Sequence, residues 1–170
     1  MLRIRELAEV ARRLGPERFA TQLGPFVLMQ RPRPDSMDHD PAAWFHRTAA
    51  LPPGSVKGPP PPVDFEELLV ATLPPAEDDG TLRLTIGRSP DCDLVLHDPA
   101  ISARHAAIAW DGERGTIQEL GSSNGTYLNG IRLGSHASLR GGDAISFGRA
   151  QFVFLLTPDL HERLLRFRQE

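Results

Sequence analysis

A series of short alternating segments between Leu82 and Leu156 limits the fold of this 170-residue chain more than any other feature. In LRLTI (82–86), hydrophobic and polar residues alternate, which is the pattern of a strand with one buried face. Similar segments follow at residues 93–96, 105–110, 116–120, 126–128, 135–139, 143–147 and 151–156, and glycine or asparagine turns separate most of them. Many short strands with turn signals every ~8–12 residues predict an all-β fold, an antiparallel β-sandwich.

One short helix is expected on each side of this series. Leu2, Leu7 and Leu14 lie near helical spacing with charged residues between them, and Gly15-Pro16 ends the pattern. After the last strand, Thr157 is a candidate N-cap with Pro158 at the first helical position. Because helices this short are marginal in isolation, both are expected to pack on the sandwich.

Composition divides the chain into four parts. They are an N-terminal helix-and-strand extension (1–30), a linker (31–62), the sandwich domain (63–157) and the C-terminal helix (158–170). The linker holds nine of the sixteen prolines, a composition that favours an extended chain. Its Trp44 and Phe45 either pin it to a surface or present a peptide to a partner. Within the sandwich domain, the first strand is expected at residues 68–73.

Charge is unevenly distributed along the chain. Residues 1–62 contain nine Lys/Arg and six Asp/Glu, whereas residues 63–170 contain ten and sixteen. An acidic sandwich domain matches the nucleic-acid backbone poorly, so no nucleic-acid partner is expected. No apolar run approaches the ~20 residues of a membrane helix, and the single cysteine, Cys92, excludes an internal disulfide. A cytoplasmic protein without a membrane partner is therefore expected.

Three polar motifs lie where a strand pattern meets a loop. They are Gly87-Arg88, Ser102-Ala103-Arg104-His105 and Ser122-Ser123-Asn124-Gly125-Thr126. If their polar side chains meet at one end of the sheets, they combine two guanidinium groups with hydroxyls and a carboxamide. That set of donors suits a dianionic, oxygen-rich ligand such as a phosphate monoester. The motifs contain no carboxylate, so they suit proton-transfer chemistry poorly.

In this order and spacing, the three motifs resemble those of the forkhead-associated (FHA) domain, a module that binds phosphothreonine in partner proteins. The resemblance covers about residues 68–156. It implies an FHA/SMAD-like β-sandwich of bacterial type, acting as a phosphothreonine-binding adaptor in Ser/Thr kinase signalling. The implied partner is a phosphothreonine-containing protein, either a Ser/Thr kinase or one of its substrates, and no cofactor is implied.

The resemblance also implies roles for single residues. The phosphopeptide-binding residues would be Arg88, Ser102, Arg104, Ser123 and Asn124, with Asn124 holding the peptide backbone. Structural roles fall to Gly87, His105, Gly125, Thr126, Asn129 and Gly130, the last two as a type I′ hairpin turn. Ala103 departs from the family, which often has a polar residue at this position.

Two other functions fit parts of the sequence less well. A hydrolase would use Ser102 and His105, but no G-x-S-x-G nucleophile turn occurs, so no catalytic residues are expected. A metal site built from Cys92, His97 and His105 has no common zinc spacing, so no metal is expected.

Two hypotheses about partners remain open. The same fold could act as a scaffold that binds an unmodified protein, an alternative that Ala103 favours weakly. In addition, Thr48 has Leu51 three residues after it, the position that FHA domains often select. Phosphorylated Thr48 would then bind the site in the same chain or in a second copy.

Overall fold

The computed structural model describes residues 4–30 and 80–166, with side chains from Leu7 onward. The linker, the strand expected at residues 68–73 and Thr48 lie outside the described residues. The helices are α1 (Ile4–Leu23) and α3 (Thr157–Arg166), and the strands are β1 (Phe26–Gln30), β2 (Leu82–Gly87), β3 (Leu94–Val95), β4 (Ala106–Trp110), β5 (Gly115–Glu119), β6 (Thr126–Leu128), β7 (Ile131–Arg132), β8 (His136–Leu139), β9 (Ala144–Phe147) and β10 (Ala150–Leu156).

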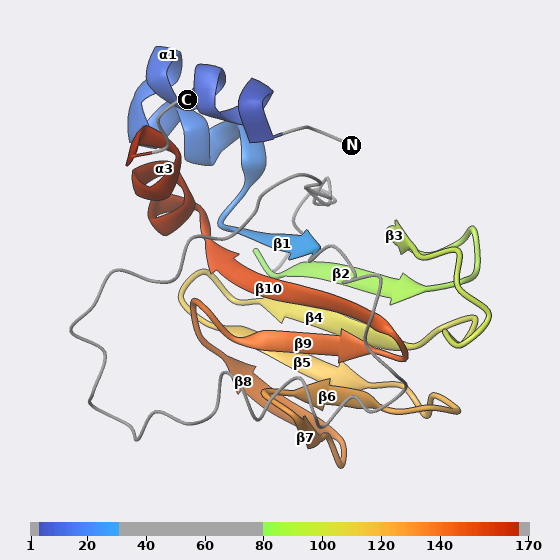
Figure 1. The fold of residues 1–170 in the computed structure, drawn as a ribbon. Helices are drawn as coiled ribbons and strands as arrows, with labels where there is room; N and C mark the ends of the chain where they lie inside the picture. Colours follow the sequence, from blue (N-terminus) through green and yellow to red (C-terminus); the bar gives the residue numbers. More distant parts are fainter. Residues whose placement is uncertain (1–3, 31–79, 167–170) are drawn as a thin grey trace.

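Two packed sheets form the body of the molecule (Figure 1). Within the described residues, one sheet has the strand order β1-β10-β9-β6-β7 and the other has the order β3-β2-β4-β5-β8. The predicted all-β sandwich with a helix at each end is thus confirmed. One pair departs from the antiparallel prediction, because the two-residue strand β3 runs parallel to the end of β2.

The core lies between the sheets and follows from strand alternation. Leu84, Ile108 and Ile117 are direct neighbours across β2, β4 and β5, and all three are fully buried. Phe147 and Phe154 fill the same cluster from the other sheet. The residues next to these core positions, such as Arg83 on β2 and Thr116 on β5, are exposed, which is why the sequence shows a period of two.

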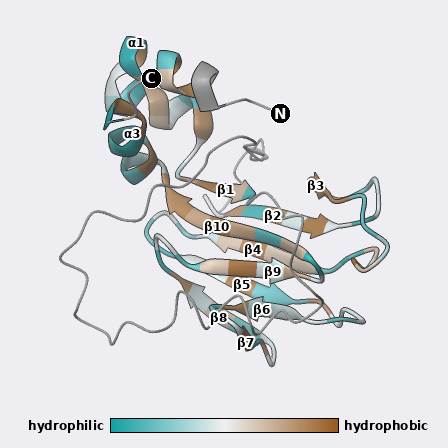
Figure 2. Cartoon of the chain, viewed as in Figure 1, coloured by the Kyte–Doolittle hydropathy of each residue, from teal (hydrophilic) through white to brown (hydrophobic). Residues whose placement is uncertain are grey.

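Strand β1 is an integral part of the sandwich rather than of a separate extension. It pairs antiparallel with β10, with Phe26 opposite Leu156 and Gln30 opposite Phe152. Phe26 and Leu28 face the main core, whereas Val27 and Met29 face the helices. The 1–30 part thus contributes a strand to the sandwich, while the predicted boundary at residue 63 lies outside the described residues. Figure 2 shows β1 and β10 as largely hydrophobic strands.

A second core joins the helices to the outer face of β1 and β10. Leu7 and Phe19 of α1 and Leu160 of α3 are buried in it with residues of both strands. Helix α1 consists of two helical segments with a break at Gly15, whose φ of 70° and ψ of 167° are not helical. The first segment therefore ends where the Gly15-Pro16 pair predicts, and a second segment continues to Leu23. Within residues 4–30 and 80–166, no helix is both long and apolar enough to span a membrane.

The two helices are tied together by a buried histidine. The Nε2 of His161 on α3 lies 3.0 Å from the carbonyl oxygen of Ala11 on α1, and its ring contacts Phe19 with centroids 5.2 Å apart. The side chain of Thr157, the first residue of α3, also donates to the carbonyl of Gly24. These contacts hold α3, near the C-terminus, against α1 and the residue that follows it.

Candidate functional site

The sheet topology brings the three polar motifs to one end of the sandwich. Strands β2, β4 and β5 are consecutive antiparallel neighbours, so the end of β2, the start of β4 and the end of β5 meet at the same edge. In Figure 1 these ends lie on the right of the sheets. We call residues 88, 100–104 and 122–125, which lie in the loops at this edge, the rim.

The first two motifs are joined through their backbones. The amide of Arg88 donates to the carbonyl of Ser102 at 2.9 Å, and the amide of Ser89 donates to the carbonyl of Ala103 at 3.0 Å. A Cβ atom on Gly87 would lie 2.2 Å from that same Ala103 oxygen. Only glycine at this position therefore allows the two loops to approach so closely.

His105 joins the second motif to the third. Its side chain is fully buried, and its Nδ1 accepts a hydrogen bond from the backbone amide of Ser102 at 3.1 Å. Because Nδ1 accepts, the ring proton is on Nε2, which donates to the carbonyl of Gly125 at 3.1 Å. Both ring nitrogens are thus used by the main chain, and neither holds the Ser102 hydroxyl as a catalytic base would.

Ser102 lies at the centre of the rim. Its Oγ accepts a hydrogen bond from the backbone amide of Ser123 at 3.0 Å, which connects the second and third motifs directly. A hydroxyl that accepts in this way keeps its own proton for donation. The half-buried Ser102 side chain therefore presents one oriented donor to a ligand.

The two predicted arginines flank this serine and are exposed. Arg88 is oriented by its Nε, which donates to the carbonyl of Ile101 at 3.2 Å and leaves both terminal nitrogens available. Within residues 80–166, neither Arg88 nor Arg104 lies within salt-bridge distance of a carboxylate. The nearby thiol of Cys92 has a raised pKa because of burial, which the charge of Arg104 only partly offsets.

Asn124 is exposed but already holds one partner. Its Nδ2 donates to the carbonyl of Ala100 at 2.6 Å, so the side chain ties the third loop to the second. The carbonyl oxygen of its carboxamide remains available to accept a backbone amide of a peptide. Ser123 is also exposed beside it, with its own amide bound to Ser102.

The sequence did not single out Glu119, which supports the third loop from below. Its carboxylate accepts hydrogen bonds from the amide and the hydroxyl of Ser122, and the Ser122 hydroxyl accepts from the amide of Gly125 at 2.9 Å. Burial alone would raise the pKa of Glu119, but the nearby Thr126 hydroxyl and the hydrogen bonds from Ser122 outweigh it and lower the pKa. The sequence signal for this role is the spacing of Glu119, at the end of a strand, three residues before Ser122.

The remaining predicted structural residues divide between the rim and the far end of the sheets. Gly125 has a φ of 83°, and the buried Thr126 begins β6 beside the rim. Asn129 and Gly130 have φ values of 50° and 83° and form the two-residue turn between β6 and β7, away from the rim. These paired positive φ angles are those of a type I′ turn.

No group of three His, Cys, Asp or Glu side chains that could hold a metal ion occurs in the described part of the chain. Cys92 is buried and bonds the Ala103 carbonyl through its thiol, while both nitrogens of His105 are used by backbone groups. The donor set of the rim is therefore one of arginine, hydroxyl and amide groups, which suits an oxyanion.

The fold and the rim define a β-sandwich module with a hydrogen-bonded polar end. Comparison with known families gives the particular class: residues 84–148 match the family model of the FHA domain. This part of the chain therefore contains an FHA domain, which confirms the resemblance found in the sequence.

Several named proteins share this domain. The chain is 40% identical over 72 residues to the glycogen accumulation regulator GarA of Mycolicibacterium smegmatis, covering 42% of this chain and 45% of that protein. It is 41% identical over 69 residues to the oxoglutarate dehydrogenase inhibitor of Corynebacterium jeikeium, covering 41% and 47%. The match thus spans less than half the length of these relatives.

Among solved structures, the chain is similar to Mycobacterium tuberculosis EmbR in complex with a low-affinity phosphopeptide. The TM-score is 0.43 with 35% sequence identity, covering 44% of this chain and 20% of EmbR. The similarity thus covers less than half of this chain.

Proposed function

We propose that this protein is a signalling adaptor whose rim binds a phosphothreonine-containing segment of a partner protein. The partner would be a Ser/Thr kinase or a protein that such a kinase phosphorylates. The observation that supports this most strongly is the position of Ser102. Its hydroxyl accepts a hydrogen bond from the Ser123 amide and keeps its own proton for a ligand. The exposed Arg88 and Arg104 lie in the same loops, and within residues 80–166 neither is within salt-bridge distance of a carboxylate.

The chemistry of a phosphorylated threonine fits these donors. The modification adds a charge of about -1.5 to -2 and three acceptor oxygens. Arg88, oriented through its Nε, offers its two terminal nitrogens as a fork for two of those oxygens, and Arg104 adds a second charge. Because the loops are already held by hydrogen bonds, little ordering accompanies binding.

The peptide backbone would be held by the Asn124 carboxamide oxygen and by the exposed Ser123. Preference for threonine over serine requires an apolar surface for the γ-methyl group. The relatives are named as a regulator and as an enzyme inhibitor, and both names are consistent with a protein that acts by binding others. No bond-making step is needed for such a role.

Binding of an unmodified partner is the second candidate. Two observations favour it: Ala103 has no polar side chain at the rim, and the amide nitrogen of Asn124 is already engaged by Ala100. The two candidates differ in their dependence on phosphate and on Arg88.

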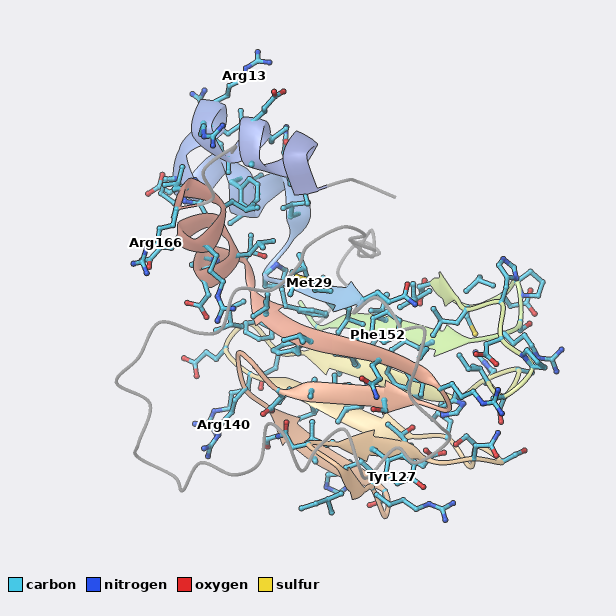
Figure 3. The ribbon with its side chains drawn as sticks, viewed as in Figure 1. Arg13, Met29, Tyr127, Arg140, Phe152 and Arg166 are labelled. Carbon is cyan, nitrogen blue, oxygen red and sulfur yellow. The ribbon has the colours of Figure 1, made fainter. Side chains whose placement is uncertain are left out.

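The decisive experiment screens an oriented phosphothreonine peptide library and titrates the selected peptide into the full chain. Arg88→Ala should weaken binding about 10- to 100-fold, because a charge-assisted hydrogen bond contributes about 1.5–3 kcal/mol. Arg140→Ala, at the opposite end of the sheets (Figure 3), should have no effect. The dephosphorylated peptide should not bind.

Equal affinity for the phosphorylated and dephosphorylated peptides, or an Arg88→Ala variant that binds as the parent does, would support the unmodified-partner scaffold instead. A phosphoserine version of the selected peptide tests the threonine preference separately.

A further inference from the structure

Arg132 on β7 is an exposed arginine that contacts the third loop of the rim. A Cβ atom on Gly125 would lie 2.6 Å from Nε and 3.3 Å from Nη2 of Arg132. The guanidinium therefore lies directly against the Gly125 backbone, the residue that follows Asn124. A side chain at position 125 would displace the guanidinium from this position.

The strand register explains why Arg132 points to the rim. After the turn at 129–130, the chain reverses, so that Arg132 lies opposite Tyr127 and the Leu133 amide donates to the Thr126 carbonyl at 2.9 Å. Strand β7 therefore leads back towards the start of β6, where the third loop ends. Figure 3 labels Tyr127, the residue opposite Arg132, on the lower side of the sandwich.

The charge of Arg132 is not neutralised by the groups around it. Within residues 80–166, no carboxylate lies within salt-bridge distance of its guanidinium. Glu119, the acidic residue that supports the same loop, is bound to the amide and hydroxyl of Ser122. Arg132 thus adds a third guanidinium to the end of the sandwich that holds Arg88 and Arg104.

We infer that Arg132 determines specificity by binding an aspartate or glutamate that flanks the phosphothreonine on the Asn124 side. This inference rests on the proposed function. An extended peptide advances about 3.3 Å per residue, so a ligand held by Asn124 passes its next residues towards Gly125 and Arg132. An exposed guanidinium without a carboxylate partner favours an acidic side chain there and disfavours a basic one.

The test uses an alanine-based phosphothreonine peptide with a single Glu, Ala or Lys at each of three positions on either side. For the parent protein, Glu at one position or at two neighbouring positions should tighten binding about two- to fivefold over Ala, the range of an exposed ion pair. Arg132→Ala should remove this preference, Arg132→Lys should keep part of it, and Arg132→Glu should favour Lys at the same position.

Controls separate this inference from the proposed function. Arg140→Ala should retain the Glu preference, and raised salt should reduce the preference in the parent protein. If no phosphothreonine peptide binds, the proposed function and the inference both fail. If phosphothreonine peptides bind but Glu gives no advantage, or gives the same advantage in Arg132→Ala and in the parent, only the role of Arg132 is overturned.

Discussion

The two ends of the sandwich use polar residues in opposite ways. At the far end, Asp111 accepts the amides of Glu113 and Arg114, and Asp143 accepts the amide of Arg140 and the side-chain amide of Asn129. These carboxylates are satisfied by their own turns.

At the rim, hydrogen bonds hold the loops together but leave donors unused. The Ser102 hydroxyl proton and the terminal nitrogens of Arg88 have no acceptor in the described part of the chain. The comparison shows that closed turns and a binding end can be built on the same strands. At the far end the polar groups of the turns bond one another, whereas at the rim some hydrogen-bond donors remain available to a ligand.

The largest effect should come from forcing the first two loops apart. Gly87→Ala would place a Cβ 2.2 Å from the Ala103 oxygen, so the loops must separate. We expect a loss of about 1–3 kcal/mol of unfolding free energy or more, with loss of phosphothreonine binding. Denaturant unfolding and peptide titration measure both.

A matched control for this variant is Gly134→Ala, because a Cβ there has nothing within 4 Å. It should change neither quantity. A Gly87→Ala protein with parental stability and affinity would show that the close approach of the loops is not required.

His105 provides the next test, because it holds the rim without touching a ligand. His105→Ala removes the bonds to the Ser102 amide and the Gly125 carbonyl and leaves both groups buried or half-buried. Each unsatisfied buried group costs about 1–3 kcal/mol. Amide hydrogen exchange at Ser102 should become faster than in the parent.

His136→Ala is the control, because His136 is exposed on β8. Exchange at Ser102 should stay slow in this variant. Equal exchange in all three proteins would contradict the role assigned to His105.

The smallest effect should come from the far end. Hydrogen bonds from the amides of Glu113 and Arg114 lower the pKa of Asp111 below its ordinary range. A lowered pKa in the folded state means that Asp111 stabilises the protein above the pKa of the unfolded chain, and that this contribution is lost as the pH falls through the folded pKa. Asp111→Ala should lower Tm slightly at pH 7, less so in acid, and leave peptide affinity unchanged.

A change in phosphothreonine affinity for Asp111→Ala would contradict the view that the far end takes no part in binding. Peptide titration of this variant at pH 7 is the measurement.

Much of this fold could be predicted from the sequence because strands with one buried face alternate visibly. Leu82–Ile86 is such a strand, and the glycine turns mark where each ends. The convergence of Arg88, Ser102 and Asn124 on one end also followed from their positions at strand ends. Their individual roles in binding stay predictions.

Strand β1 and the supporting residues of the rim could not be predicted in the same way. FVLM at 26–29 is buried on both faces, so it shows no alternation, and its partner β10 lies at the other end of the sequence. Glu119 and Arg132 resemble ordinary surface residues, because their importance depends on loops that only the tertiary fold brings to them.

The pairing of β1 with β10 has a consequence for how the protein is made. Ala11 and His161, which join the helices above these strands, are separated by 150 positions in the chain. During synthesis the N-terminal segment must wait until the last strand has left the ribosome, and folding that depends on such distant contacts is slow. A shortened protein that lacks β1 would expose the hydrogen-bonding edge of β10, and such an edge promotes aggregation by pairing with a strand of another molecule.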